Sequence, residues 1–379
     1  MAGLVLEGAR GARGARGARG ARGARGARGA RSGAGGSVSS SALAAALTTA
    51  RDGVSGHWTL PTSAPVALPT GEDVHSNLDR WDLNVRHATL LTLLLDGVRF
   101  EGTDTTANSA KVKVEAPGVA SAADLVELVR PTADQFKTQL DYVHGYSALR
   151  LERLDEIELQ LDDITSFIGS PIGLHPDRHR HTYELIDLIH SATVSVEMRV
   201  KYELACRRPS EFSEQIQPMI DVPGHSAYPS GHATESFAIA YVLSALVSGS
   251  SQVGPNVEQQ MLRHAERIAT NRVVAGVHFP IDNVAGMILG KSLSEYFLAM
   301  FGVGSAITKR RLEISDKTGS PGKFGANDDF DYEIINNNGG PGWPKVLTES
   351  PFSQTIDSAA APKALKWLWA NAVSEWARP

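Results

Sequence analysis

The sequence predicts an all-α fold with long loops, because three segments have helical character and no alternating strand series of comparable length appears. Residues 231–247 and 280–300 are predominantly apolar, and the second segment begins at a proline, which suits the first turn of a helix. From residue 176 onward, apolar residues recur on one side of a helix that we expect to end before Pro209. These apolar residues are Leu185, Leu188, Ile189 and Ala192.

Further helices are expected on both sides of these three. Apolar residues keep a three-or-four spacing from Phe136 to Ile168, which indicates one face of a long amphipathic helix or of a pair. Another helix is expected over about residues 257–270, beyond a loop rich in proline, glycine and serine over residues 210–230. A short C-terminal helix should dock on the domain or, alternatively, form a dimer contact, through Leu365, Trp369, Ala372 and Trp376.

The chain divides into three parts by composition. Residues 8–31 repeat the triplet Gly-Ala-Arg without proline, so a collagen-like triple helix is not expected. We predict a low-complexity, disordered tail over residues 1–60, with a polyanion-binding arm as the alternative. A helical domain is expected over residues 79–305, and residues 306–379 read as a loop-rich extension that ends in the short amphipathic helix.

Composition limits the partners of the folded part. Because the first 31 residues hold eight arginines and one glutamate, the remainder is more acidic than the net charge of −5 indicates, so we expect no nucleic-acid partner. Cys206 is the only cysteine, so no internal disulfide can form. Apolar runs fall short of the roughly 20 residues of a membrane span, and no secretory signal is evident. The expectation is a cytoplasmic protein without membrane contact.

The first chemical motif pairs Lys201 with Arg208, seven residues apart. On a helix this spacing is almost two turns, so both cations would share one face before Pro209 ends the helix. Two basic residues at this spacing are more often a solvated face than a site. The motif therefore gains meaning only in combination with others.

The second motif is Pro229-Ser230-Gly231-His232, where a loop enters an apolar helix. A helix N-terminus offers unpaired backbone N–H groups to an anion, and Gly231 allows a close approach. Ser230 would add a hydroxyl donor, and His232 could exchange a proton near neutral pH. The structural alternative is that Ser230 is a plain N-cap and His232 is exposed.

The third motif comprises Arg272, His278 and Asp282. Pro280 suits a helix start, so His278 would precede the first turn and Asp282 would lie within it. The carboxylate could then accept from one imidazole nitrogen and leave the other as a lone pair directed into a pocket. Together the three motifs supply three cations, a hydroxyl, a helix N-terminus and two histidines. This set fits a tetrahedral oxyanion such as phosphate or vanadate.

These motifs resemble the superfamily that unites vanadium-dependent haloperoxidases, class A acid phosphatases and type 2 phosphatidic acid phosphatases. Its pattern is Lys, six residues, Arg-Pro; then Pro-Ser-Gly-His; then Ser-Arg, five residues, His, three residues, Asp. The chain departs from it once, with Asn271 in place of the serine, which affects fine positioning only. The resemblance implies a helical bundle of the vanadium haloperoxidase and acid phosphatase type.

In the haloperoxidase branch, the resemblance implies that vanadate is bonded to His278 and that hydrogen peroxide and a halide are substrates. His232 would assist proton transfer, Asp282 would orient His278, and Lys201 would polarise the bound peroxide. The remaining oxyanion-binding groups would be Lys201, Arg208, Ser230, Gly231 and Arg272.

The alternative is an acid phosphatase without a cofactor, in which His278 attacks phosphorus and forms a phosphohistidine while His232 protonates the leaving alcohol. A catalytically silent anion-binding relative is a third hypothesis. The run from His225 to Thr234 looks like the haloperoxidase version, and the chain lacks the spans of the membrane phosphatases, so we favour haloperoxidase. His225 would border the halide pocket as in bromoperoxidases, which predicts a preference for bromide or iodide. A small organic acceptor and a homo-oligomer are further hypotheses.

A separate cluster comprises His175, His179 and His181. A zinc site is conceivable there, but neither a cysteine nor a spaced carboxylate completes it. A polar helix start is the favoured interpretation.

Overall fold

A computed structural model provides the structure of the protein. It describes residues 41–55, 75–101, 108–119, 121–248, 250, 253–304, 306–339, 345–352 and 356–377. Within the tail predicted over residues 1–60, the structure has one helix, α2 (Ser41–Ser55). The rest of that prediction, including the Gly-Ala-Arg repeat, lies outside the described residues.

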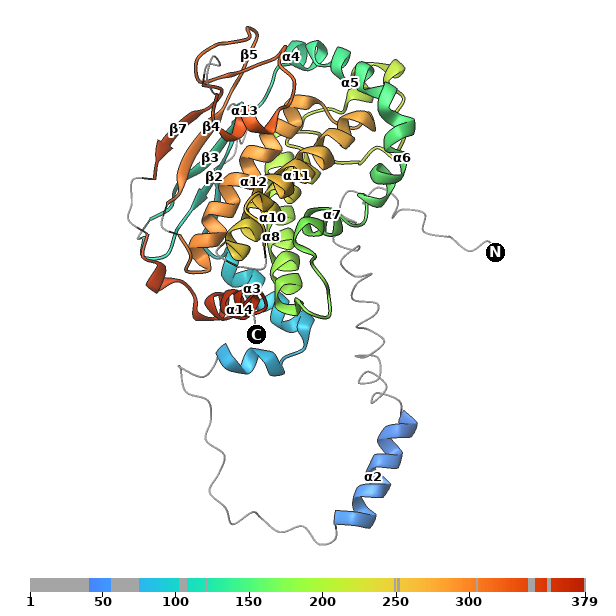
Figure 1. Ribbon diagram of the computed structural model, residues 1–379, viewed down its shortest axis with the longest axis vertical. Coiled ribbons are helices and arrows are strands. Elements are labelled where there is room, and N and C mark those ends of the chain that lie inside the picture. Colours follow the sequence, from blue (N-terminus) through green and yellow to red (C-terminus); the bar gives the residue numbers. More distant parts are fainter. Residues whose placement is uncertain are drawn as a thin grey trace, which may run out of the picture.

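The fold is mixed: a helical bundle carries a five-stranded sheet on one side (Figure 1). The prediction of an all-α fold was therefore wrong. The sheet has the order β1-β2-β3-β4-β7, with β3 and β4 parallel and the other neighbours antiparallel. Its strands are β1 (Val98–Glu101), β2 (Ser109–Val114), β3 (Ala123–Val129), β4 (Thr308–Leu312) and β7 (Thr348–Pro351); β5 (Ile314–Ser315) and β6 (Phe324–Gly325) form a separate pair.

Strand β2 shows why these residues form a sheet. Its valines Val112 and Val114 are buried, and the alternating Lys111 and Lys113 are partly exposed, which is the period of two expected of a half-buried strand. The sheet is completed from the far end of the chain, because Val126 of β3 pairs with Arg310 of β4. The extension predicted to be loop-rich thus contributes two strands to the central sheet.

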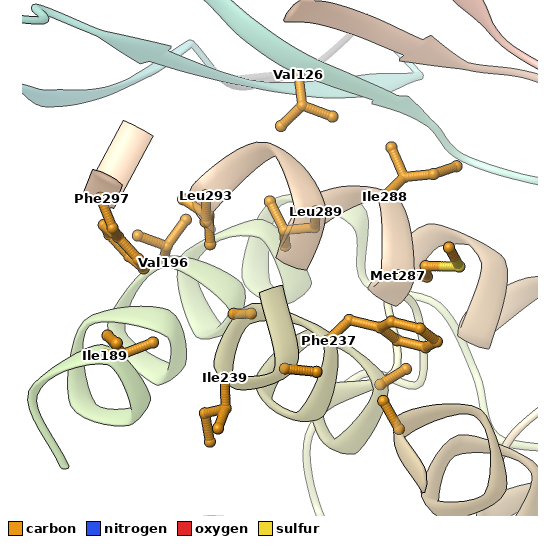
Figure 2. Close-up of a cluster of buried hydrophobic side chains, with 14 of the residues drawn as sticks. Val126, Ile189, Val196, Phe237, Ile239, Met287, Ile288, Leu289, Leu293 and Phe297 are labelled. Carbon is orange, nitrogen blue, oxygen red and sulfur yellow. The ribbon is translucent and has the colours of Figure 1, made fainter. Parts of the chain in front are cut away.

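Three helices form the core of the bundle: α8 (Arg180–Leu204), α10 (Gly231–Val247) and α12 (Pro280–Met300). The predicted bounds of α10 and α12 are confirmed. Helix α12 lies between the sheet and the other two helices, and its side chains pack in both directions (Figure 2). Figure 2 shows Val126 of the sheet on one side of α12 and Val196 of α8 and Phe237 of α10 on the other. Because almost every side of α12 is buried, its apolar residues are distributed all round the helix and not along one stripe.

The segment from Phe136 to Ile168 forms four short helices, so the prediction of one long helix or a pair was wrong. Gln139 lies at the first break, where its side chain contacts distant backbone. Its Nε2 donates to the carbonyl oxygen of Ala326 at 2.7 Å, and its Oε1 accepts from the backbone amide of Ile281 at 3.0 Å. The apolar period persists across the breaks because each helix turns buried residues inward. The four helices of this segment are α4 (Ala133–Thr138), α5 (Leu140–Tyr146), α6 (Arg150–Leu159) and α7 (Thr165–Gly169). Elsewhere, α3 (Leu83–Leu95) precedes the sheet, and α9 (Pro209–Phe212) and α13 (Tyr332–Asn336) are short helices.

Two further helices complete the bundle. Helix α11 (Val257–Val274) runs one turn beyond its predicted end, which places Arg272 in its last turn. The expected C-terminal helix is α14 (Lys363–Ser374), and it docks on the domain beside α8. The carboxylate of Glu375 accepts from the amides of His181 and Thr182 at 2.7 and 2.9 Å, so the contact caps the N-terminus of α8.

Helices α10 and α12 approach each other closely at two glycines. A Cβ atom at Gly286 would lie 2.6 Å from the carbonyl oxygen of Ser230, and one at Gly290 would lie 2.5 Å from that of Thr234. Neither distance is compatible with a side chain, because backbone lies on the other side of the contact. The position of the N-terminus of α10 therefore depends on these glycines.

We expect Gly290→Ala to lower the free energy of unfolding by about 1–3 kcal/mol, because the added methyl group overpacks the contact between α10 and α12. The matched control is Gly145→Ala in α5, where an added Cβ meets nothing within 4 Å. That variant should be neutral or gain up to about 1 kcal/mol from helix propensity. Urea unfolding of both variants measures the difference, and equal stabilities would contradict the close approach.

Candidate active site

The predicted site residues come from four elements whose ends meet in the bundle. Lys201 lies in the last turns of α8, Ser230 and Gly231 begin α10, Arg272 lies in the last turn of α11, and Asp282 lies in the first turn of α12. All of these side chains are at least nine-tenths buried. Lys201 and Asp282, which are 81 residues apart in the sequence, thus lie near each other because the ends of these helices meet.

The structure corrects the predicted arrangement of Lys201 and Arg208. They do not share a helix face, because α8 ends at Leu204 and Ala205 adopts a left-handed conformation with φ of 48°. Arg208 follows as the N-cap of α9, and Pro209 occupies the first turn of that helix. The break in the helix at Ala205 allows the Arg208 guanidinium to contact His278, with Nη1 2.9 Å from Nε2.

A small cavity lies at the meeting point of these elements. Its volume of about 60 Å³ is room for about four to six waters at about 10–15 Å³ each. One tetrahedral oxyanion, with five heavy atoms, therefore fits the cavity. Its lining includes five of the predicted site residues: His225, Gly231, His232, Arg272 and His278.

The tautomer of His278 follows from its two neighbours. Nδ1 lies 2.9 Å from Oδ2 of Asp282, and Nε2 lies 2.9 Å from Nη1 of Arg208. Because a guanidinium can only donate, Nε2 must hold the lone pair and Nδ1 must carry the proton. Burial and the charge of Arg208 keep the pKa of His278 well below its usual range, so this nitrogen is an unprotonated nucleophile or ligand atom at neutral pH.

Asp282 is held as the hydrogen-bond acceptor of this pair. Burial raises its pKa to about 7 even though the Phe279 amide, which donates to the same Oδ2 at 2.9 Å, lowers it. Two donors on one oxygen favour the carboxylate, and the positive charge of Arg208 acts in the same direction. Asp282 can therefore both orient His278 and stabilise the imidazolium that forms when Nε2 makes a bond.

His232 has one ring nitrogen committed and one available. Nε2 lies 3.0 Å from the carbonyl oxygen of Gln160, so Nε2 carries a proton and donates it to that oxygen. Nδ1 then remains for proton exchange with a ligand in the cavity. Burial and, secondly, the charge of Arg272 lower the pKa of His232 to about 4. In the ligand-free protein His232 is thus neutral near pH 7.

Arg272 supplies unused donors at the cavity wall. Its Nη2 donates to the carbonyl oxygen of Ile157 at 3.2 Å and to Oε1 of Gln160 at 3.0 Å. Its Nε and Nη1 are buried without a hydrogen-bond partner among the described residues. Buried guanidinium donors are costly to leave unpaired, so they point to an anion as the missing partner.

Lys201, Arg208 and Ser230 were predicted to bind the ligand of this cavity, but none of the three lines it. Arg208 reaches the cavity wall through its contact with His278. Nζ of Lys201 donates to the carbonyl oxygens of Ser226 and Ala227 at 3.1 and 3.2 Å and also to that of Pro229. Ser230 caps α10, because its Oγ accepts from the Ala233 amide, and its own amide donates to the carbonyl oxygen of Asp282 at 2.8 Å. Both side chains therefore hold the loop that places Gly231.

His225 lies at the edge of the same cavity. Its Nδ1 is 3.2 Å from Nη2 of Arg208, and its Nε2 is buried without a partner among the described residues. Burial and the charges of Lys201 and Arg208 lower its pKa to about 4, so the ring is neutral near pH 7. His225 is therefore placed to contact a ligand as a neutral ring.

Two residues that the sequence prediction missed belong to the site. Gln160 lies between Arg272 and His232, and its Oε1 also accepts from Nδ2 of Asn271 at 3.0 Å. Asn271, the one departure from the expected pattern, thus helps to fix the Gln160 side chain that accepts from Arg272, whereas His232 donates to the backbone carbonyl oxygen of Gln160. The second missed residue is Glu197, which lines the cavity one helical turn before Lys201. That spacing was the signal that could have revealed it.

The histidine cluster at the start of α8 serves the docking of α14. His179 stacks on Trp376 with ring centroids 4.1 Å apart, and His181 Nδ1 lies 3.2 Å from Oε1 of Glu375. Within the described residues, no group of three or more histidines, cysteines and carboxylates is placed to hold a metal ion. In the same part of the chain, no helix combines the length and apolar character needed to cross a membrane.

Comparison with known proteins identifies the domain that carries the site. No curated protein matches the chain. A crystal structure of a transmembrane PAP2-type phosphatidylglycerolphosphate phosphatase from Bacillus subtilis is similar at 20% identity and a TM-score of 0.28, over 45% of this chain and 85% of that one. Residues 187–302 match the PAP2 superfamily, and this range includes every predicted site residue from Lys201 to Asp282. Residues 187–302 are therefore a PAP2 superfamily domain.

Proposed function

We propose that the protein hydrolyses phosphate monoesters through a phosphohistidine on His278. The observation that carries the proposal is the lone pair on Nε2 of His278, held between Asp282 and Arg208 at the wall of a phosphate-sized cavity. Membership of residues 187–302 in the PAP2 superfamily supports a phosphatase-like activity. Haloperoxidase, the function favoured by the sequence, becomes the second candidate.

The first step transfers the phosphoryl group to the protein. Nη1 of Arg208 first gives up its hydrogen bond to Nε2 of His278 and donates to a phosphate oxygen instead. Nε2 then forms a bond to phosphorus as the ester P–O bond breaks, and the leaving oxygen takes a proton from Nδ1 of protonated His232. The Asp282 carboxylate stabilises the positive charge that develops on the imidazole. The unused donors of Arg272 and the Gly231 amide at the N-terminus of α10 stabilise the negative charge on the equatorial oxygens.

The second step releases phosphate. Neutral His232 accepts a proton from water as the water oxygen attacks phosphorus, and the P–N bond to His278 breaks. The lone pair returns to Nε2, and His232 is protonated again for the next cycle. The proton balance closes, because each cycle gives one proton to the alcohol and takes one from water.

The low pKa of His232 sets the expected pH dependence. The general acid must be protonated in the free enzyme, and above a pKa of about 4 its protonated fraction falls tenfold per pH unit. We therefore expect kcat/KM for a chromogenic phosphate monoester to rise steadily as pH falls from 8 toward 5. His232→Ala should lower kcat by about 100-fold or more and remove this contribution to the slope.

Titration of the substrate persists in the variant, so the difference between the two profiles isolates His232. Parallel profiles for the two proteins would contradict its role as general acid. Absence of phosphate-ester hydrolysis at every pH would contradict the proposed function itself.

Vanadate-dependent halide oxidation with hydrogen peroxide is a second candidate, favoured by His225. The donors at the cavity suit vanadate as well as phosphate, because both are tetrahedral oxyanions, and Arg272 has two donors without a partner among the described residues. His278 would hold the vanadate, with Arg208, Arg272 and the Gly231 amide around it. Bound vanadate would supply the activation of peroxide toward a halide. The unpartnered Nε2 of His225 would then border the halide.

For this candidate we expect the unmodified protein with orthovanadate to oxidise bromide and iodide in preference to chloride. Chloride is the hardest of the three halides to oxidise and requires a dry halide position. The neutral but polar imidazole of His225 makes this position less dry. His225→Phe should therefore shift the ratio of chlorination to bromination toward chloride. Halogenation of a dye substrate measures this ratio. If the unmodified protein with orthovanadate brominates no dye, the candidate is eliminated.

A further inference from the structure

Glu197 is a buried carboxyl group at a cavity suited to an anion. It lies on α8, its side chain is fully buried, and it lines the same cavity as Gly231 and His278. As an ionised carboxylate, it would have no hydrogen-bond partner on either oxygen among the described residues. A Cβ atom at Gly231 would lie only 2.7 Å from Oε1 of Glu197, so this carboxyl group is directly beside the N-terminus of α10.

The neighbours of Glu197 decide its protonation state. The adjacent Glu235 is ionised, because the charge of His190, whose Nε2 lies 3.0 Å from Oε2, outweighs the effect of burial and lowers the pKa of Glu235 to about 2. Burial, the negative charge of Glu235 and a hydrogen bond between the two carboxyl groups raise the pKa of Glu197 well above its usual range, although Lys201 opposes them. Glu197 is therefore a neutral carboxylic acid with one O–H donor, which faces Glu235 in the ligand-free protein and can turn to an anion in the cavity.

The donors on the α8 side of the cavity also point to Glu197. An ammonium has three N–H groups, and those of Lys201 are directed to the carbonyl oxygens of Ser226, Ala227 and Pro229. Lys201 thus holds the loop and leaves no donor for a ligand in this arrangement. Helix α8 presents a polar group to the cavity one turn earlier, at Glu197.

We propose that Glu197 acts as a neutral hydrogen-bond donor that binds an oxygen of the tetrahedral oxyanion from the α8 side of the cavity. The inference rests on the proposed function, because it names a further binding residue for the same ligand. An ionised carboxylate at this position would repel the anion, whereas a protonated one adds a hydrogen bond to a charged acceptor. A side chain at position 231 would displace the Glu197 carboxyl group from this position.

The test compares the affinity of the full-length protein for inorganic phosphate at pH 7 by calorimetry. Glu197→Gln keeps a neutral donor, so its Kd should stay within about threefold of the unmodified protein. Glu197→Met keeps the length of the side chain but removes the donor, so its Kd should rise about 10- to 100-fold, as loss of a hydrogen bond to a charged group does. Glu203→Gln, on α8 with its carboxylate paired to Arg199, is the matched control and should leave Kd unchanged.

Each other outcome overturns the proposal in a recognisable way. Tighter binding by both Glu197 variants would mean that Glu197 is an ionised, repelling carboxylate. Equal binding by all variants would mean that Glu197 does not contact the anion. If the unmodified protein binds no phosphate, the proposed function fails and this inference fails with it.

Infrared spectroscopy of the ligand-free protein adds a readout that does not depend on binding. The difference spectrum between the unmodified protein and Glu197→Gln at pH 7 should contain the carbonyl band of one protonated carboxyl group, beyond any band of Asp282 that both proteins share. Its absence from the difference spectrum would also overturn the proposal.

Discussion

Three cationic side chains, Lys201, Arg208 and Arg272, are buried around His278. Hydrogen bonds from the rest of the site offset the free-energy cost of burying them. Removing an ion from water costs several kcal/mol unless partners replace the water. Lys201 finds three backbone carbonyls, and Arg208 finds the carbonyl of Val277 at 2.8 Å and the imidazole of His278. Arg272 is only partly satisfied, with two donors left unpartnered among the described residues. An oxyanion bound as proposed would complete the set.

The site thereby divides into groups that hold the backbone and groups that face the ligand. Lys201 and Ser230 fix the loop before α10, and Gly286 and Gly290 allow α12 to approach α10 closely enough to place it. With the loop fixed, Gly231 presents a helix N-terminus opposite the lone pair of His278. The sheet packs on α12 from the side opposite α8 and α10, so this helix is held from both sides (Figure 2).

The sequence was informative where structure is local and less so where it depends on distant contacts. The bounds of α10 and α12 follow from Ser230 as N-cap, Pro280 in the first turn and continuous apolar runs. Strand β4 could not be predicted, because Arg310 pairs with Val126 across more than 180 residues. The motifs named five of the residues that line the cavity. Which of Lys201 and Glu197 faces the cavity depends on the backbone carbonyls that the Lys201 ammonium contacts. Spacing along a helix does not contain that information.

The central claim is that Nε2 of His278 is the atom that bonds to the transferred phosphoryl group. Rapid quench of the protein during turnover of a phosphate monoester, followed by peptide mass spectrometry under alkaline conditions that preserve phosphohistidine, tests it directly. The account predicts phosphate on His278 in the unmodified protein and none in His278→Ala. Phosphate on another residue, or turnover by His278→Ala at the unmodified rate, would contradict it.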